Sequence, residues 1–344
     1  MSQQPVTSEP IAVLGAGSWG TALAIQFART RRPVRLWARD AVLLGEMARE
    51  RVNRRYLPDS PLPPAVSLEP RLEAALSGAR DVLIAVPSHA FRSLLEQLRP
   101  LLKPGMRLVW ATKGFEQRTG KLPHQVVRDV LGADWPIAVL SGPTFAKEVG
   151  AGLPTAIAVA SPDASFAAAI ARGISGENFR AYISNDIVGV EVGGAVKNVL
   201  AIGAGIADGM GFGANTRIAL ITRGLAEMTR LGEALGAQRE TFMGLAGLGD
   251  LVLTCTDNQS RNRRFGLALA AGKPVDRALA EIQQVVEGYH AASAVHDVAQ
   301  RAGVEMPLCE ATYRVLYHGL DVRDAVRELM ARAIRPETDP ARVP

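Results

Sequence analysis

The sequence predicts an α/β protein, with an N-terminal Rossmann-type, doubly wound parallel sheet (residues 10–186) and a C-terminal all-helical domain (residues 187–336). The first observation behind this is an apolar segment, Ile11–Leu14, followed by a glycine-rich loop and a helix-like run. The second is the alternation of short apolar segments with helical stretches through the first half. The third is a change near Ser184, after which helical periodicity dominates.

The apolar segments of the first half are hydrophobic on both faces, which is typical of parallel strands covered by helices on both sides. Right-handed crossovers between such strands give the doubly wound arrangement. The predicted strands are 11–14, 34–37, 81–86, 107–111, 137–140 and 155–160, with helices at 91–101 and 120–131. The later predicted helices are 192–206, 215–235, 261–271, 275–284, 289–302, 309–318 and 321–334. We expect loose tails over the first ten residues and from the last helix to Pro344.

Composition restricts the class of protein. A chain of 344 residues, 48% hydrophobic and 21% charged, is long enough for two domains of an ordinary soluble protein. Its two cysteines, Cys255 and Cys309, have no CxxC neighbour, so we expect buried core thiols in a reducing cytoplasm rather than disulfides. No apolar run approaches the length of a membrane span, and the first ten residues lack the order of a signal peptide.

The charge pattern favours small anionic ligands. The net charge is +5 and the pI about 9.5, but the basic residues are scattered and aromatic residues are only 5%. A nucleic-acid surface needs a larger basic patch, so small phosphorylated ligands fit better and we expect no nucleic-acid partner. The closest histidines, His290 and His296, are six positions apart, and we infer no metal site.

The loop Gly15-Ala-Gly-Ser-Trp-Gly20 has the strand and helix on either side that dinucleotide binding requires. In this interpretation Gly15 permits the tight turn, Gly17 lets a pyrophosphate approach the backbone, and Gly20 allows close packing of helix on strand. The N-terminus of the helix then meets the phosphates. The alternative is a strand-turn-helix without a ligand.

Other candidate residues follow strand ends, where ligands bind in open parallel sheets. Lys113 follows one predicted strand, and Gly142 and Thr144 follow another. Lys113 is either a site residue or a surface lysine, and Gly142 and Thr144 are either site residues or turn and capping residues.

Lys197 is the only ionisable residue between Val192 and Ala207, in a stretch rich in glycine. Desolvation there would lower its pKa and suit it to acid–base work. The alternatives are a snorkelling lysine or a structural ion pair. The glycines in this helix indicate close packing or approach of a ligand.

Two further features belong with this lysine. Asp250 ends a glycine-rich loop, where it is either a site carboxylate or a turn residue. Ser260 is a predicted N-cap that places Arg261 and Asn262 in the first helical turn, where basic residues oppose the dipole unless an anion binds. We expect Arg263 and Arg264 to form a solvated basic face.

Seven blocks in order, spread between Ile11 and Leu329, make the chain resemble bacterial NAD(P)-dependent glycerol-3-phosphate dehydrogenases. They are GAGSWGTALA (15–24), ATKG (111–114), SGPTFAKE (141–148), GVEVGGAVKNV (189–199), GLGDL (247–251), SRNR (260–263) and VVEG (285–288). The resemblance implies reversible reduction of dihydroxyacetone phosphate to sn-glycerol 3-phosphate for phospholipid synthesis, by an enzyme that is often a homodimer.

The resemblance also implies residue roles. Lys197 would be the proton donor or acceptor, with Asp250 and Lys113 beside it. The substrate would meet Lys113, Gly142, Thr144, Lys197, Asp250, Ser260, Arg261 and Asn262. The cofactor would meet Gly15, Gly17, Ser18, Trp19, Gly20, Arg39, Lys113, Ala146, Arg261, Val285 and Glu287.

The choice of cofactor depends on the end of the second predicted strand. An NAD-selective strand ends in an acidic residue, whereas here Arg39 precedes Asp40 and can pair with a 2′-phosphate. We therefore expect NADP, with NAD tolerated. Two rival functions stay open at this point: a hydroxy-acid dehydrogenase of the same two-domain build, and a non-catalytic dinucleotide-sensing module.

Overall fold

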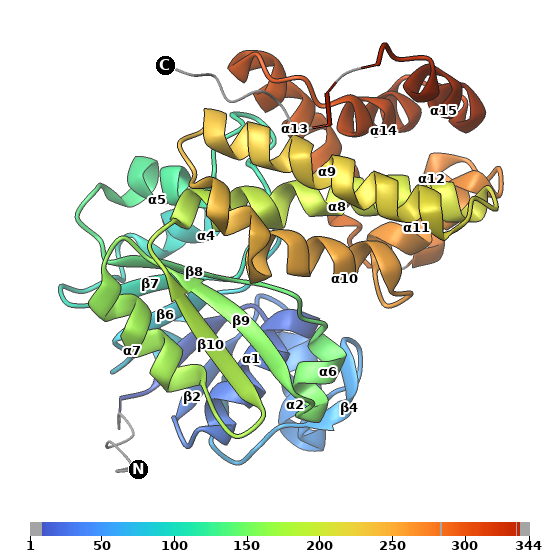
Figure 1. The fold of residues 1–344 in the computed structure, drawn as a ribbon. Helices are drawn as coiled ribbons and strands as arrows, with labels where there is room; N and C mark the ends of the chain where they lie inside the picture. Colours follow the sequence, from blue (N-terminus) through green and yellow to red (C-terminus); the bar gives the residue numbers. More distant parts are fainter. Residues whose placement is uncertain (1–8, 283, 335, 338–344) are drawn as a thin grey trace.

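The computed structural model describes residues 9–282, 284–334 and 336–337. A sheet flanked by helices forms the N-terminal half, and a bundle of helices packs against it as the C-terminal half (Figure 1). The predicted fold class is confirmed. The tail predicted before residue 9, the one predicted after residue 337 and position 283 of a predicted helix lie outside the described residues.

Eight strands form one sheet in the order β10-β9-β8-β7-β6-β1-β2-β5. They are β1 (Ile11–Leu14), β2 (Val34–Trp37), β5 (Val66–Glu69), β6 (Asp81–Ile84), β7 (Arg107–Trp110), β8 (Ile137–Ser141), β9 (Thr155–Ala160) and β10 (Phe179–Ser184). A hairpin of β3 (Val52–Asn53) and β4 (Leu57–Pro61) lies apart from this sheet. Every residue of β1, β6 and β8 is buried, as expected for strands covered on both faces.

The prediction of a wholly parallel sheet was wrong at one strand pair, since β8 and β9 are antiparallel. The connection between them contains only the six-residue helix α6 (Ala146–Ala151), with glycines of positive φ at Gly142 and Gly152. Six helical residues span about 9 Å, which is well short of the roughly 17 Å of the five-residue strand β8, so α6 alone does not carry the chain back along the sheet. The chain therefore enters β9 in the direction opposite to β8.

In the described part of the chain, seven helices flank the sheet, and the two with predicted bounds begin at other residues than the sequence predicts. They are α1 (Ser18–Arg29), α2 (Ala41–Glu50), α3 (Leu72–Leu76), α4 (Ser88–Leu98), α5 (Pro123–Leu131), α6 and α7 (Ala164–Ile174). The predicted helix 120–131 starts three residues late because Gly120 has φ +69° and Pro123 occupies the first turn. The predicted helix 91–101 starts three residues early, immediately after Pro87.

The C-terminal half of the described chain is helical, as predicted. Its elements are α8 (Ile187–Gly209), α9 (Ala214–Ala234), a 3₁₀ turn (Arg239–Met243), a π turn (Leu245–Gly249), α10 (Asp250–Thr256), α11 (Arg261–Ala270), α12 (Val275–Ile282), α13 (Glu287–Ala302), α14 (Pro307–Tyr317) and α15 (Val322–Met330). The sequence patterns missed α10, which is only seven residues long. In Figure 1, α8 runs through the middle of this half, with other helices around it.

Helix α8 corrects the expectation that no apolar run reaches membrane length. It is long and apolar enough to cross a membrane, but 89% of its most apolar stretch is buried inside the protein. Its glycines explain how it can be so buried, because a side chain at Gly193 or Gly205 would overlap the backbone of Ala246 or Arg263. Helix α8 is therefore the core helix of a soluble protein.

Both cysteines are buried and free, as predicted. Burial raises the pKa of Cys255 to about 12 and that of Cys309 well above its ordinary value. Both are therefore core thiols rather than nucleophiles.

Candidate active site

The glycine loop joins β1 to α1 in the geometry that the sequence predicts. Gly15 has φ +119°, and a side chain there would overlap the carbonyl of Ala85. A side chain at Gly20 would overlap the carbonyl of Gly15, whereas nothing lies within 4 Å of a Cβ built on Gly17. The loop is therefore packed tightly on its inner side and open beside Gly17.

The first turn of α1 has no side-chain cap at Gly17. Ser18 and Trp19 begin this turn, and the indole Nε1 of Trp19 is buried without a hydrogen-bond partner among the described residues. Unpaired donors at a helix N-terminus attract an anion. An open cradle with an orphaned buried donor fits a bound dinucleotide.

At the end of β2, Asp40 has a structural role. Its carboxylate accepts a hydrogen bond from the backbone N–H of Leu43 at 3.0 Å and so caps α2. Arg39, one residue earlier, is exposed and has no ion pair within the described chain. The basic side chain at this strand end is therefore free to meet a ligand, and the acidic one is engaged.

Three predicted residues meet in one buried cluster. Lys197 of α8 donates to Asp250 Oδ1, and Lys113, which follows β7, donates to Asp250 Oδ2 at 2.7 Å. Lys197 is 7% exposed and Asp250 1%. Lys197 also donates to Thr254 Oγ1 at 3.0 Å, while this hydroxyl donates to the backbone oxygen of Asp250 at 2.6 Å. The interpretations of Lys113 as a surface lysine and of Lys197 as a snorkelling one are wrong.

The charges of this cluster shift its titration. Burial lowers the pKa of Lys197 to about 8, with Lys113 adding to this effect and Asp250 opposing it. Burial alone would raise the pKa of Asp250, but Lys113 and Lys197 together hold it below its ordinary value. One carboxylate shared by two ammonium groups leaves an excess positive charge, and a lysine that titrates near neutral pH can donate or accept a proton.

The local fold explains why Asp250 reaches Lys197. The preceding residues form a single π turn, and Gly193 of α8 allows this turn to approach the helix backbone. Isolated π turns are frequent at functional sites. Pro143, which lies between Gly142 and Thr144, would be 3.4 Å from a Cβ at Gly249. The segment after β8 therefore lies beside the π turn that carries Asp250.

The same segment holds the other residues predicted after β8. Gly142 has φ +151°, and the hydroxyl of Thr144 donates to its carbonyl oxygen at 3.2 Å. Ala146 begins α6. The hydroxyl of Ser141 is buried without a partner within the described chain and lies close to Gly194 of α8.

The N-terminus of α11 is built as predicted. Ser260 caps it by accepting a hydrogen bond from the N–H of Arg263 at 3.2 Å, and Arg261 stays partly exposed. The expectation of a solvated Arg263 was wrong, because its guanidinium is buried and pairs with Asp208 at 2.6 Å. Arg264 is exposed, as expected. Arg261 and Arg264 therefore both reach solvent, and of the two Arg261 is the one at the first position of the helix.

Asn262 lies in a second buried network that the sequence patterns did not reveal. Its amide donates to Asn198 Oδ1 at 2.9 Å and accepts from the N–H of Gly288 at 2.9 Å. Asn198 also donates to Glu287 Oε2 at 3.3 Å. Glu287 begins α13, and Val285, two residues earlier, is exposed. Since Asn198 follows Lys197 directly, this network joins α11 and α13 to the helix that carries the lysine.

Sequence reasoning missed Thr254, Asn198 and Ser141. Thr254 follows Asp250 by four residues, which is the spacing of one helical face, but α10 was not predicted. Asn198 and Ser141 stand beside candidates in the sequence and had no distinguishing pattern of their own. The described residues contain no group of three His, Cys, Asp or Glu side chains able to hold a metal ion.

A dinucleotide-type loop at one strand end and a buried lysine–carboxylate cluster at another define a nicotinamide-dependent, two-domain oxidoreductase. Family models agree: residues 10–167 match the N-terminal and residues 186–327 the C-terminal part of NAD-dependent glycerol-3-phosphate dehydrogenase. The chain is 59% identical to glycerol-3-phosphate dehydrogenase [NAD(P)+] of Edwardsiella ictaluri over 97% of its length and 98% of that protein. It is 56% identical to the Aeromonas salmonicida enzyme over 95% and 98%, respectively.

A solved structure gives the same result. The crystal structure of glycerol-3-phosphate dehydrogenase from Coxiella burnetii superposes with a TM-score of 0.91 at 49% identity, over 94% of this chain and 99% of that one. The chain belongs to the NAD-dependent glycerol-3-phosphate dehydrogenase family and is an NAD(P)-dependent oxidoreductase. The two rival functions, a hydroxy-acid dehydrogenase and a non-catalytic sensor, are thereby excluded.

Proposed function

We propose that the enzyme reversibly reduces dihydroxyacetone phosphate to sn-glycerol 3-phosphate for glycerophospholipid synthesis in the cytoplasm, with Lys197 as proton donor and acceptor. The observation that carries this assignment is the buried Lys113–Asp250–Lys197 cluster beside the segment that follows β8. The carbonyl oxygen at C2 of the substrate needs a proton when it becomes an alcohol. An ammonium group with its pKa near 8 supplies that proton at neutral pH.

The excess positive charge of the cluster has a second role. As the C2 oxygen gains negative charge, Lys197 and Lys113 stabilise it, and desolvation strengthens the attraction. Asp250 favours the charged form of Lys197 and fixes the position of both lysines by accepting one hydrogen bond from each. The substrate phosphate would bind at the N-terminus of α11, where Arg261 and the capped turn at Ser260 offer a guanidinium and backbone N–H groups, with Asn262 supporting the turn. Gly142 and Thr144 would line the remaining side.

The cofactor would lie along the carboxyl ends of β1, β2 and β7. The nicotinamide, when bound, supplies or accepts the hydride at C2 of the substrate. The residues that would hold the cofactor are Gly15, Gly17, Ser18, Trp19, Gly20, Arg39, Lys113, Ala146, Arg261, Val285 and Glu287. The exposed Arg39, next to an Asp40 engaged in capping, favours NADP over NAD.

One assay tests the proposal. Initial rates of NADPH and NADH oxidation are measured separately with dihydroxyacetone phosphate and with a panel of keto acids. We expect dihydroxyacetone phosphate to be the preferred substrate and NADPH the preferred cofactor. A preference for a keto acid would exclude the proposed substrate, and equal rates with NADH would exclude the role of Arg39. We also propose a homodimer and a domain boundary between residues 186 and 187, which sedimentation and limited proteolysis would test.

A further inference from the structure

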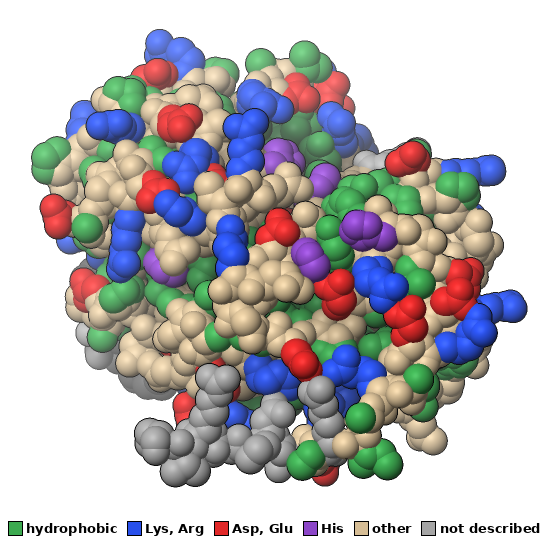
Figure 2. All heavy atoms as spheres, turned by 90° about the horizontal axis from the view of Figure 1, so that it is seen from above, with side chains coloured by type: hydrophobic (Ala, Val, Ile, Leu, Met, Phe, Trp, Pro, Cys, Tyr) green, Lys and Arg blue, Asp and Glu red, His purple; other side chains and the backbone are tan. Residues whose placement is uncertain are grey.

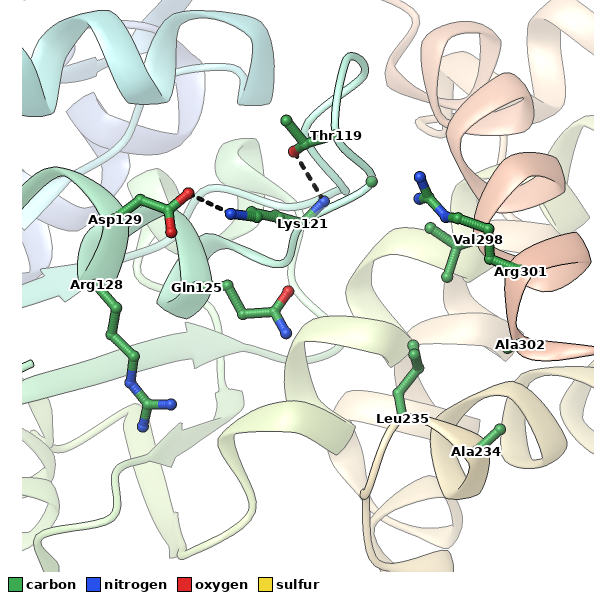
Figure 3. A pocket seen from close by; sticks show the side chains of 11 residues that line it. Thr119, Lys121, Gln125, Arg128, Asp129, Ala234, Leu235, Val298, Arg301 and Ala302 are labelled. Atoms are coloured by element: carbon green, nitrogen blue, oxygen red, sulfur yellow. Dashed lines mark hydrogen bonds and ion pairs between the residues drawn. The ribbon is translucent and has the colours of Figure 1, made fainter.

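A cavity of about 640 Å³ lies between the two halves of the chain, lined by residues other than those of the proposed active site. One wall is the loop after β7 together with α5, and the other is the end of α9 together with the last turns of α13 (Figure 3). Its volume lies within the range of small-molecule sites. None of the residues that line it belongs to the proposed substrate or cofactor sites.

The polar side chains of the cavity favour an anion. Lys121, Arg128 and Arg301 are basic, and Asp129 is the single acidic residue in the lining. Asp129 is already engaged, because it accepts from Lys121 at 2.6 Å and from Arg92 at 3.1 Å. The guanidinium groups of Arg128 and Arg301 form no ion pair with any described residue. The two residues belong to the lining from opposite halves of the chain, and in Figure 3 the side chain of Arg128 extends away from Arg301 toward the rim.

The other lining groups suit a small organic molecule. The side-chain amide of Gln125 extends toward the middle of the cavity in Figure 3, with Leu235 and Val298 on the opposite wall. Arg301 lies directly against Gly120, where a side chain would overlap its guanidinium. The position of Arg301 across the boundary therefore depends on a glycine, and its planar donors are placed to bind carboxylate or phosphate oxygens.

Each wall of the cavity is connected to the proposed active site. The loop that carries Lys121 also carries Lys113, which binds Asp250. Helix α13 has Glu287 in its first turn, bonded to Asn198, and Arg301 in its last. A ligand that bridges these walls would change the position of one half relative to the other.

Helix α5 is connected to the same region through a buried network. The backbone N–H and the imidazole of His124, at the start of α5, hydrogen bond to Glu191 of α8 at 3.0 and 2.5 Å. Trp110 at the end of β7 donates to the same carboxylate at 3.0 Å. A displacement of α5 would therefore act on the helix that carries Lys197.

We propose that this cavity is a regulatory site for a small organic anion bearing phosphate or carboxylate groups, and that its occupancy alters the affinity of the enzyme for its substrate. A ligand that contacts both walls fixes the angle between the halves, and binding at two coupled sites is reciprocal. The ligand bound here therefore acts through domain position, without touching the reacting atoms.

The test compares the wild type with the double variant R128Q/R301Q and with R172Q, which removes an exposed arginine on α7 that has no ion pair among the described residues. Pyrophosphate represents the phosphate class and citrate the carboxylate class. Binding of each is measured by calorimetry on the NADP-bound enzyme, and the KM for dihydroxyacetone phosphate is measured with and without each anion.

We expect the double variant to keep its basal kcat and to bind the recognised anion at least tenfold more weakly, whereas R172Q behaves as wild type. The change in KM caused by that anion should disappear only in the double variant. The stronger of the two anions identifies the ligand class. Equal binding in all three proteins, or no binding at millimolar anion, would overturn the site, and binding without any change in KM would overturn the regulation.

Discussion

Lys197 and Asp250, 53 positions apart in the chain, form a buried ion pair between α8 and α10. The pair exists because Gly193 lets the π turn before Asp250 lie against the helix backbone. Breaking one partner of a buried pair leaves an uncompensated charge, so this pair and Lys113 form a unit that mutations will perturb together.

Lys197→Ala should reduce turnover by two to four orders of magnitude, because that is the usual contribution of a positioned proton donor. Binding of NADPH, measured by fluorescence titration, should change little. Lys273→Ala is the matched control, since this lysine is exposed and forms its ion pair with Glu281 in α12. Turnover close to that of the wild type would remove Lys197 from the mechanism.

The rates of reduction and of oxidation should change in opposite directions as the pH rises. Reduction requires the protonated amine, whose fraction falls above its pKa of about 8, so kcat/KM with dihydroxyacetone phosphate should fall about tenfold per pH unit beyond that point. Oxidation of glycerol 3-phosphate requires the neutral amine and should rise toward a plateau above pH 8. Profiles of the two directions that coincide between pH 7 and 10 would contradict this assignment.

Two substitutions should move this pH profile in opposite directions. Asp250 raises the pKa of Lys197 and Lys113 lowers it, so Asp250→Asn should shift the fall in reduction rate to lower pH and Lys113→Met to higher pH. Both variants will lose activity. The measured quantity is therefore the pH at which kcat/KM for reduction begins to fall, rather than the rate itself. Shifts of the same sign would show that the electrostatic account is wrong.

Arg261→Ala should raise the KM for dihydroxyacetone phosphate with a smaller effect on kcat. The loss of a charge-assisted hydrogen bond of roughly 2–3 kcal/mol corresponds to a change of about 30- to 150-fold. Arg264→Ala removes a charge of the same kind from an exposed position three residues along the helix and serves as the control. If Arg261→Ala and Arg264→Ala have the same KM for dihydroxyacetone phosphate, the substrate phosphate binds elsewhere.

Arg39→Ala should weaken the preference for NADPH by about one to two orders of magnitude in kcat/KM, because it removes the cation expected at the 2′-phosphate. The value for NADH should stay nearly unchanged. Arg31→Ala, at an exposed arginine in the turn between α1 and β2, controls for the general loss of positive charge. Proportional losses with both cofactors would indicate a structural role for Arg39.

The distribution of charged side chains on the surface indicates which kind of anionic ligand suits the protein. Lys and Arg side chains on the face seen in Figure 2 are interspersed with Asp and Glu. This distribution suits small anions bound in defined sites better than an extended polyanion.

The sequence alone was sufficient to predict structural features that depend only on residues close together in the chain. Strand-loop-helix order around Gly15, the N-cap at Ser260 and the isolation of Lys197 among apolar residues are local patterns, and local sterics and desolvation make them readable. The reversal at β9 was missed because strand patterns carry no direction, and the direction depends on the path of the connection through α6.

Only the tertiary structure decided which polar and charged side chains contact one another. The sequence pattern predicted a solvent-exposed Arg263. In the structure this residue is buried and forms an ion pair with Asp208, 55 positions away. Asn262 is bound by Asn198 and Gly288, and Lys113 reaches Asp250 across 137 positions. A side chain's partner over such distances is fixed by the packing of whole elements, because pairing energies depend on burial and geometry that no local pattern contains.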